Sequence, residues 1–478
     1  MPYTRAFCIH GHFYQPPRED PLTGLIPTEP GAAPYNNWNE RVLAECYRPN
    51  ADLGNFERIS FNIGPTLFPW LAQHDRSTYK RIIAQDRNNF YRSGFGNASA
   101  QAYNHTILPL ASYSDKEIQI SWGIADFEHR YNHKPQGFWL PETAVDLDTL
   151  TVLASHGIQF TILAPWQADS ESLDPTEPYL VNLPNGRTIT VFFYQGDLSA
   201  KVSFDPKTTS NADEFALHEL NYRYNQAKAM RGEAQLLIVA SDGELYGHHQ
   251  PSRERFLAHL LDGDSAKAEI TSIIPALWLK EHPARQLIKI RDNTSWSCHH
   301  GVLRWSGECA CSPWDARWKV YFRRALNRLS ADLDRLFLEE VYPHISKPRL
   351  LQQRYILVIL GSLPVNKLIE EMASHNLTSE QVWRIHILLE VQRERQRMFT
   401  SCGWFFEDFD RIEPRNNLAY AAQAVRLARI ATGVDLAPQA ISEFEYVCSP
   451  LTNVSGDTIF KDHLYRTWAM NTAGLPGQ

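Results

Sequence analysis

The chain has 478 residues, of which 43% are hydrophobic and 21% are charged, and its formal net charge is -7. This composition predicts a packed core and excludes an intrinsically disordered chain. The length is ample for one large domain and a second unit. Because the net charge is mildly negative and no stretch concentrates Lys and Arg, the sequence argues against DNA or RNA as a partner.

The sequence also lacks signals for a membrane or an oxidising compartment. No apolar run reaches the length of a transmembrane helix, and the first residues turn polar at His10, unlike a signal peptide. The cysteines number seven and are scattered, which is typical of reduced thiols rather than of a disulfide framework. We therefore expect a cytoplasmic protein that has no membrane partner.

Over roughly the first 275 residues, short apolar runs alternate with helical patterns. Helices are predicted near residues 38–47, 65–71, 115–131, 147–156 and 213–230. Strands are predicted at residues 6–9, 59–63, 137–140, 160–163, 188–194, 236–240 and 270–274. This order is typical of a parallel α/β architecture, either a barrel or an open sheet. Polar clusters follow several strands rather than one adjacent pair, which favours the barrel.

The remainder of the chain is predicted to be helical. From Trp314 to Leu336, apolar and aromatic residues recur at helical spacing, and more helices are expected at 351–361, 382–396 and 417–431. Thr378 and Gln381 form a capping box before the third of these four segments. We place the domain boundary so that residues 1–290 form the α/β domain and residues 291–478 the helical domain.

Four groups of polar side chains follow apparent strands. They are His10, His12 and Gln15; Asn104 and His105; Glu142; and Asp242, Glu244 and His248. An acid after a strand is often only the N-cap of a helix. Two carboxylates from well-separated strands, Glu142 and Asp242, would however suit glycoside cleavage. That reaction needs one protonated carboxyl to donate to the leaving oxygen and one ionised carboxyl to attack or to activate water.

The same groups also permit a metal-dependent hydrolase, such as a carbohydrate deacetylase. His10, His12, Asp242 and His248 could bind zinc or manganese, although no paired-histidine helix spacing joins them. A separate stretch, Cys298-His299-His300 with Cys309-x-Cys311, has a zinc-like composition. Its spacing is irregular, and cysteines in a tryptophan-rich segment are more often buried thiols. We predict no metal and no other cofactor.

Several motifs, in this order, resemble glycoside hydrolase family 57. His10-Gly-His-Phe-Tyr-Gln15-Pro resembles the first conserved region of the family, with Phe13 and Tyr14 inserted. Trp139-Leu-Pro-Glu142 resembles the third region and Asp242-Gly-Glu-Leu-Tyr-Gly-His248 the fourth, whereas Gly96 to His105 matches the second only loosely. The stretches 294–305 and 400–406 resemble a subset of the family in which a DUF3536-type helical region follows the catalytic part.

The resemblance implies an incomplete, TIM-like (β/α)7 barrel with a helical C-terminal domain that closes over the active site. It implies a retaining glycosidase with Glu142 as nucleophile, Asp242 as general acid/base and no catalytic metal. The implied substrates are α-glucans, with α-amylase, 4-α-glucanotransferase and branching activities as alternatives. A glucan-binding protein without catalysis is an alternative of another class.

Further side chains are expected to contact the sugar. The predicted substrate-binding residues are His10, His12, Gln15, His105, Trp139, Glu244 and His248. Trp296, Trp305 and Trp404 could stack on sugar rings, but they suit a buried core equally well.

Overall fold

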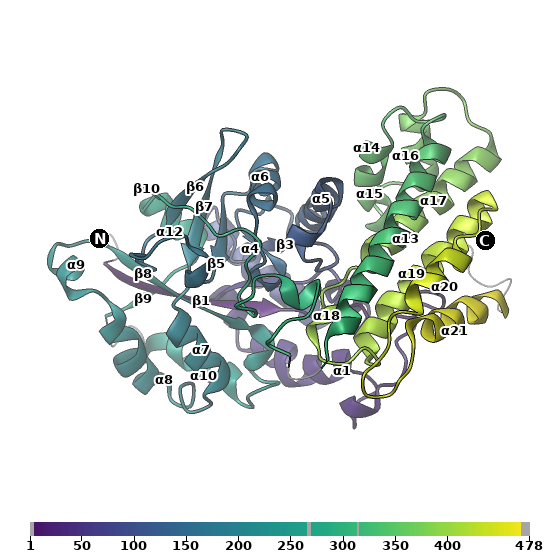
Figure 1. The fold of residues 1–478 in the computed structure, drawn as a ribbon. Helices are drawn as coiled ribbons and strands as arrows, with labels where there is room; N and C mark the ends of the chain where they lie inside the picture. Colours follow the sequence, from purple (N-terminus) through teal and green to yellow (C-terminus); the bar gives the residue numbers. More distant parts are fainter. Residues whose placement is uncertain (1–3, 265–268, 313–314, 470–478) are drawn as a thin grey trace. The chain divides into compact units, whose positions relative to one another are not determined.

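The computed structural model describes residues 4–264, 269–312 and 315–469, which divide into two compact units (Figure 1). The first unit comprises Met1–Gln15, Thr28–Ala102 and Phe127–Ser297. The second comprises Pro16–Pro27, Tyr103–Asp126 and Cys298–Gln478. Two segments that precede residue 290 in the sequence are therefore part of the second unit.

Seven parallel strands, counted over the described residues, form a closed ring in the first unit. They are β1 (Arg5–Phe13), β2 (Ser60–Ile63), β3 (Ala100–Gln101), β4 (Phe138–Trp139), β5 (Phe160–Leu163), β7 (Thr188–Phe193) and β8 (Gln235–Asp242). Ladders join β8 to β1, β1 to β2, β3 to β4 and β5 to β7. The isolated bridges of Phe61 to Ala98 and Gly137 to Phe160 close two of the remaining gaps. The Gln195 N–H donates to the Ile238 carbonyl at 2.7 Å and closes the ring. The ring has seven strands, one fewer than the eight of a TIM barrel, which confirms the predicted (β/α)7 barrel.

Three further strands lie outside this ring. β6 (Tyr179–Asn182) runs antiparallel to β7, and β10 (Gln286–Leu287) pairs with β6. β9 (Thr271–Ser272) pairs with β1 beside Ala6 and Phe7, at the place where the sequence predicts the last strand. The sequence analysis did not predict β6 or β10.

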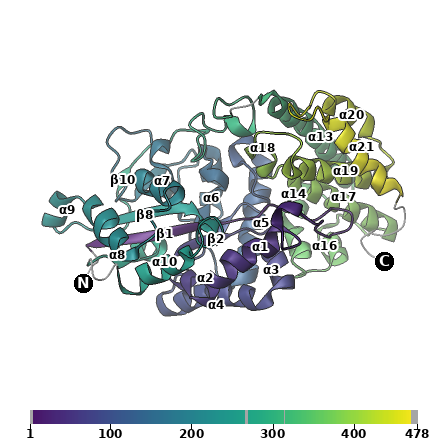
Figure 2. The same cartoon turned by 90° about the horizontal axis from the view of Figure 1, so that it is seen from below.

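Helices connect the strands of the first unit and surround them (Figures 1 and 2). They are α1 (Trp38–Val42), α2 (Arg48–Asp52), α3 (Phe68–His74), α4 (Arg76–Ser93), α6 (Leu147–Ser155), α7 (Gly196–Phe204), α8 (Ala212–Glu214), α9 (Gln226–Met230), α10 (Arg253–His259) and α12 (Pro275–Glu281). The continuous helix predicted over 213–230 is wrong. The chain leaves α-helical geometry after Glu214, and α9 begins at Gln226. Its N-cap is Asn225, whose side chain accepts a hydrogen bond from the Lys228 N–H.

The second unit is helical, as predicted, although Trp314, the first residue of the predicted pattern, lies outside the described residues. It contains most of α5 (Tyr113–Tyr131), with α13 (Arg317–Val341), α14 (Pro348–Arg354), α15 (Ile356–Ile359), α16 (Val365–Met372), α17 (Ser379–Arg397), α18 (Cys402–Phe405), α19 (Ile412–Thr432), α20 (Ala437–Phe444) and α21 (Gly456–Ala469). The predicted capping box at Thr378 starts α17. The long helices α13, α17 and α19 pack side by side (Figure 1). Within the described ranges, no helix combines the length and apolarity needed to span a bilayer.

Strand β1 is longer than predicted, and this difference places two candidate residues. The strand continues through Gly11 to Phe13, so His10 and His12 lie within it rather than after it. Side chains two residues apart in a strand point to the same face. In the registers of β1 with its neighbours, His10 lies beside Ser60 and Ala240, and His12 beside Asn62 and Asp242.

Candidate active site

Asp242 is the last residue of β8, directly after a buried apolar run. Its neighbour in β1 is His12, so the general acid predicted from the sequence and one of the predicted histidines share one end of the barrel. The carboxyl ends of parallel barrel strands are where such folds assemble catalytic groups.

Glu142 lies in a short 3-10 turn, Pro141–Thr143, that follows β4. The backbone of Glu142 is left-handed, with φ 57°, and that of Thr143 is too, with φ 47°. Non-glycine residues seldom adopt this conformation, and it costs about 1–3 kcal/mol at each position. Hydrogen bonds hold the turn, because Thr143 Oγ1 donates to Gln167 Oε1 at 2.9 Å and Gln167 Nε2 donates to the Thr143 carbonyl at 2.8 Å.

Two side chains from one distant segment orient the Glu142 carboxylate. Trp296 Nε1 donates to Glu142 Oε2 at 3.0 Å, and Ser297 Oγ donates to the same oxygen at 2.8 Å. The Trp296 N–H also donates to the Glu142 carbonyl at 3.0 Å, so the backbone of this segment is attached to the same residue. Donors of this kind stabilise negative charge on the carboxylate.

The carboxyl group of Asp242 has a raised pKa. Its side chain keeps access to water, but the protein packed around it removes part of its solvation. This loss of solvation and the charge of Glu142 raise the pKa of Asp242 from 3.8 to about 7. The two predicted catalytic carboxyl groups are therefore near enough for the charge of Glu142 to act on the protonation of Asp242.

Polar side chains on β1 and β2 form a directed chain of hydrogen bonds. His10 Nε2 contacts Asn62 Oδ1 at 3.2 Å, and His10 Nδ1 contacts Ser60 Oγ at 2.9 Å. Asn62 Nδ2 donates to His12 Nδ1 at 2.9 Å. Because the amide oxygen only accepts and the amide nitrogen only donates, neutral His10 carries its proton on Nε2 and neutral His12 also carries its proton on Nε2. Asn62 also donates to Gln101, at the end of β3.

Both histidines are buried against aromatic rings. Trp139 stacks on His10 with ring centroids 4.5 Å apart and on His12 at 5.5 Å, and Trp296 meets Trp139 edge-on at 5.1 Å. Burial lowers the pKa of His10 to about 3 and that of His12 to about 4. Both imidazoles are therefore neutral near pH 7. The two ring nitrogens of His10 are engaged by Ser60 and Asn62, which supports a positioning role for this residue.

Glu244 lies behind Asp242 and is buried. Its Oε1 accepts hydrogen bonds from the Tyr14 N–H at 2.9 Å and from the Tyr47 hydroxyl at 2.6 Å. Burial, together with the nearby charge of Asp242, raises the pKa of Glu244 to about 8. Glu244 thus attaches the turn after β8 to the segment after β1 and to the helical segment 38–52, which supports a positioning role.

His248 and Gly247 attach the turn after β8 to Glu45 of the same helical segment. His248 Nδ1 lies 2.5 Å from Glu45 Oε2. Gly247 has a φ of 134°, and a Cβ at this position would lie 2.2 Å from the Glu45 carbonyl oxygen, so only glycine fits. Gln15, the last residue of its segment in the first unit, accepts a hydrogen bond from Thr66 Oγ1 on its carbonyl at 2.6 Å.

His105, Trp305 and Trp404 belong to the second unit. His105 has a φ of 54°, is buried, and its Nδ1 lies 2.7 Å from Ser401 Oγ. Trp305 and Trp404 are both 0% exposed. Trp404 packs against Phe322 and beneath the Arg323 guanidinium, which lies 3.7 Å from its ring centroid. Of the two interpretations given for these tryptophans, the structure favours a buried core, because neither presents a face to a sugar.

Several residues at the site were not predicted from the sequence. They are Ser60, Asn62, Gln101, Tyr47 and Ser297. Asn62 carries the clearest signal in retrospect, because it is a buried amide within strand β2, between the apolar residues Phe61 and Ile63. Ser297 carries none, since its partner Glu142 is 155 residues away in the sequence.

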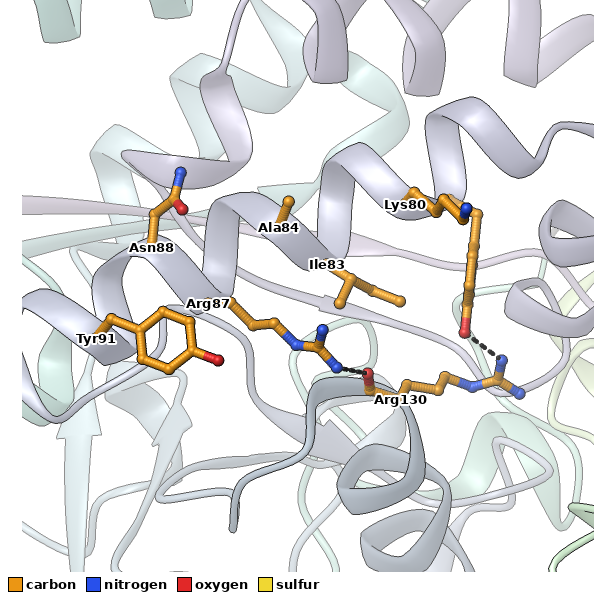
Figure 3. Close-up of a pocket in the computed structure, with 8 residues that line it drawn as sticks. Lys80, Ile83, Ala84, Arg87, Asn88, Tyr91 and Arg130 are labelled. Atoms are coloured by element: carbon orange, nitrogen blue, oxygen red, sulfur yellow. Dashed lines mark hydrogen bonds between the residues drawn. The ribbon is translucent and has the colours of Figure 1, made fainter.

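A hollow of about 510 Å³ lies along α4 in the first unit (Figure 3). It is lined by Tyr79, Lys80, Ile83, Ala84, Arg87, Asn88, Tyr91 and Arg130. Arg87 Nη2 donates to the Arg130 carbonyl at 3.2 Å, and Arg130 Nη1 donates to the Tyr79 hydroxyl at 3.4 Å. The lining includes no carboxylate and none of the predicted site residues, so it offers no acid/base pair.

The predicted metal-binding set does not converge on one point. Over residues 4–264, 269–312 and 315–469, the single group of three or more metal-ligating side chains that lie close enough to share an ion is Cys298, His300, Cys309 and Cys311. His10, His12, Asp242 and His248 form no such group. The histidines and acids at the barrel end therefore fit hydrogen bonding and proton transfer better than metal coordination.

Comparison with known proteins agrees with this geometry. The profile of glycosyl hydrolase family 57 matches residues 35–291, and that of a domain of unknown function, DUF3536, matches residues 314–471. No curated protein matches the chain.

Several solved structures have a similar fold. An exo-type maltose-forming amylase from Pyrococcus sp. has a TM-score of 0.76 at 16% identity, covering 92% of this chain and 82% of that chain. A branching enzyme of family 57 type from Pyrococcus horikoshii has a TM-score of 0.60 at 15% identity, covering 97% and 94%. An α-amylase from Thermotoga maritima has a TM-score of 0.59 at 15% identity, covering 98% and 99%. With the family profile spanning more than half of its length, the chain belongs to glycosyl hydrolase family 57.

Proposed function

We propose that this protein is a retaining glycoside hydrolase that acts on α-glucans by double displacement. The proposal rests on the placement of Glu142 in the turn after β4 and of Asp242 at the end of β8, with Trp296 and Ser297 donating hydrogen bonds to the Glu142 carboxylate. The substrate class is supported by the similar structures, which are an amylase that forms maltose, a branching enzyme and an α-amylase.

In the first step, Asp242 donates its proton to the glycosidic oxygen while Glu142 attacks the anomeric carbon. A pKa of about 7 keeps a large share of Asp242 protonated at neutral pH, as a general acid requires. Trp296 and Ser297 fix Oε2 of Glu142, and we assign the attack to Oε1. The bond from the anomeric carbon to the leaving oxygen breaks, and a glycosyl ester of Glu142 forms.

In the second step, the ionised Asp242 removes a proton from the incoming hydroxyl, which attacks the anomeric carbon and releases Glu142. Two inversions give net retention. Water as acceptor gives hydrolysis, which we take as the primary activity. A sugar hydroxyl as acceptor gives 4-α-glucanotransferase or branching activity with the same residues.

The neutral histidines support this mechanism. Because the pKa values of His10 and His12 lie far below 7, neither introduces positive charge beside the catalytic carboxyl groups. We assign to His12 and Trp139 the recognition of the sugar next to the cleaved bond, and to His10 and Asn62 the orientation of His12.

The main claim is tested by Glu142→Gln and Asp242→Asn in the full chain. We expect Glu142→Gln to lower kcat on an active glucan at least about 10³-fold, and Asp242→Asn to lower it about 10²- to 10⁴-fold. Glu281→Gln and Asp169→Asn are matched controls on exposed carboxylates and should keep wild-type rates. Near-full activity of either site variant, with circular dichroism and melting temperature unchanged, would remove that residue from its proposed role.

The acceptor is decided by the products formed from maltoheptaose. Shorter sugars alone indicate hydrolysis, longer linear sugars indicate transfer, and new α-1,6 anomeric signals in the proton NMR spectrum indicate branching. Glucan binding in the complete absence of any product over a long incubation would favour the binding protein without catalysis. Release of acetate from an acetylated sugar, abolished by a chelator and restored by a divalent cation, would favour the deacetylase.

A further inference from the structure

We propose that Cys298, His300, Cys309 and Cys311 form a structural zinc site in the second unit. The four side chains come from two short stretches, Cys298-x-His300 and Cys309-x-Cys311. One ligand atom of each lies within 4.8 Å of all the others. The mechanism proposed above uses none of these residues.

The spacing of the ligand atoms matches a tetrahedral zinc centre. The Sγ atoms of Cys298 and Cys309 are 3.3 Å apart, and those of Cys298 and Cys311 are 4.0 Å apart. His300 Nδ1 lies 3.3 Å from the Cys309 sulfur and 3.4 Å from the Cys311 sulfur. Zinc–sulfur bonds of about 2.3 Å and zinc–nitrogen bonds of about 2.0–2.1 Å give tetrahedral edges of roughly 3.6–3.8 Å, close to the observed separations.

A disulfide does not account for this arrangement. The described residues include every cysteine of the chain, and none of these cysteines forms a disulfide. A pair of bonded sulfurs would lie about 2.05 Å apart, well inside the 3.3 Å between Cys298 and Cys309. A disulfide would also give no reason for an imidazole nitrogen nearly equidistant from two sulfurs.

The local backbone places the ligands in two turns. The Gly301 N–H donates to the Cys298 carbonyl at 3.1 Å, and the Ser312 N–H donates to the Cys309 carbonyl at 2.9 Å. The backbone N–H of Cys311 also hydrogen-bonds the Cys309 sulfur. Hydrogen bonds from backbone amides to metal-bound sulfur are the kind of outer contact that fixes ligands and tunes a metal site.

The loop between the two turns is anchored in the core. Trp305 lies midway along it and is fully buried, and its carbonyl accepts a hydrogen bond from Arg323 Nε at 2.9 Å. Cys298 and Cys309 are buried, whereas His300 and Cys311 are exposed. The site therefore has a fixed inner side and an outer side through which an ion can enter.

The surrounding charge suits three thiolates. Zinc with three thiolates and one neutral histidine carries a net charge of -1. Lys319 of α13 is buried and interacts electrostatically with the sulfurs of Cys298 and Cys309. A cation beside the site would balance the residual negative charge. A tetrahedral set of sulfur and nitrogen ligands with no open position is typical of a structural rather than a catalytic zinc.

The test is the metal content of the full chain, which does not depend on any glycosidase activity. We expect one zinc per chain, measured by inductively coupled plasma mass spectrometry after purification with reducing agent. We expect Cys311→Ser and His300→Ala to weaken zinc affinity at least about 100-fold, measured by competition with a chromogenic chelator. The matched controls Cys448→Ser and His299→Ala should keep one zinc; Cys448 is an exposed cysteine of the same unit and His299 the exposed neighbour of His300.

Cobalt substitution provides a second readout from the intact wild type. Replacing zinc by Co²⁺ should give the strong visible absorption of a tetrahedral site together with thiolate-to-cobalt charge-transfer bands, and both should be lost in Cys311→Ser. The proposal is overturned if the reduced protein, supplied with zinc without oxygen, binds less than half an equivalent. Bound iron in place of zinc, or equal loss of zinc in the Cys448→Ser control, would also overturn it.

Discussion

The turn after β4 and the turn after β8 each present one carboxyl group, but they hold it in different ways. Glu142 lies on a left-handed backbone and receives two hydrogen bonds from the Trp296–Ser297 segment. Asp242 ends a regular strand, and its protonation responds to its surroundings and to the charge of Glu142. One turn thus stabilises a charged carboxylate, and the other favours a proton. Two similar side chains can take opposite roles in one site because their environments differ.

The largest effect is expected when each of the two carboxyl groups is removed, and chemical rescue with azide then tests their different roles. We expect Glu142→Gly and Asp242→Gly each to lose at least about 10²-fold in turnover of an α-maltosyl substrate with a good leaving group. In Glu142→Gly, azide takes the place of the missing nucleophile and should give a β-glycosyl azide. In Asp242→Gly, azide attacks the glycosyl ester of Glu142 and should give the α-glycosyl azide.

The stereochemistry of the azide products, read from the proton NMR coupling at the anomeric carbon, separates the two roles. Glu281→Gly is the control and should form no azide product at a rate above that of wild type. An α-product from Glu142→Gly would contradict the assignment of the nucleophile, whatever the size of the loss in rate.

A smaller effect is expected from the two donors to Glu142. Hydrogen bonds to a charged group contribute about 1.5–3 kcal/mol each, so Ser297→Ala and Trp296→Phe should each lower kcat about 10- to 100-fold. Ser306→Ala, which removes a hydroxyl that contacts only the Val302 carbonyl at 3.3 Å, is a matched control. If the Ser297→Ala and Ser306→Ala variants have equal kcat values, the Ser297 hydrogen bond has no catalytic role.

The pH profile tests the environment of Asp242. Because its pKa is raised to about 7 and the reaction needs the protonated form, kcat/KM should fall as the pH rises above about 7. Glu142→Gln removes the neighbouring charge and should lower the pKa of Asp242, measured by carbon-13 NMR of labelled aspartate with Asp242→Asn for assignment. A pKa of Asp242 that is the same in wild type and Glu142→Gln would mean that the two carboxyl groups do not interact.

The raised pKa of Asp242 also makes the stability of the protein depend on pH. The unfolded carboxyl keeps its ordinary pKa of 3.8, whereas the folded one has a pKa of about 7. The folded state therefore binds more protons between these values, and its free energy of unfolding should fall as the pH rises from about 4 to about 7. Asp242→Asn should abolish that part of the pH dependence of the melting temperature.

The smallest effect is expected for substitutions of Glu244, and it concerns the free energy of unfolding. Glu244→Gln keeps an acceptor for Tyr14 and Tyr47 and, since the pKa of Glu244 is about 8, replaces a side chain that is mostly neutral at pH 7. It should leave the free energy of unfolding nearly unchanged, whereas Glu244→Ala should lower it by about 1–3 kcal/mol by leaving donors unpaired. Urea denaturation at pH 7 compares them, and equal losses in both variants would contradict a role in accepting these hydrogen bonds.

Local signals in the sequence were sufficient for much of the fold and for the pair of carboxylates. The buried strand β8 and the capped helix α17 have clear patterns, and Glu142 and Asp242 stand where apolar runs end. Helix α4 was missed because most of its surface is polar and its apolar face is narrow. The helix predicted over 213–230 failed because Asn225 starts a second helix there, a local competition that periodicity does not detect.

The remainder of the site depends on contacts between residues distant in the chain. Ser297 meets Glu142 only through the folded barrel, and Asn62 connects His10 to His12 only because β1 and β2 pair in one register. The extension of β1 through Gly11 depends on β8 and β2, which supply hydrogen-bond partners on both sides. The four ligands of the proposed zinc site have a zinc-like composition in the sequence, but their spacing is irregular, and only the fold shows that they converge.

The left-handed turn at Glu142 and Thr143 creates a trade-off for protein engineering. Each residue occupies a conformation that glycine or asparagine adopts with less strain, and Thr143 is also β-branched. A library of variants selected for thermal stability alone should therefore accumulate glycine or asparagine at these two positions and lose turnover as it does so. Stabilising this enzyme without inactivating it requires that selection leave this turn constant and act on the rest of the barrel.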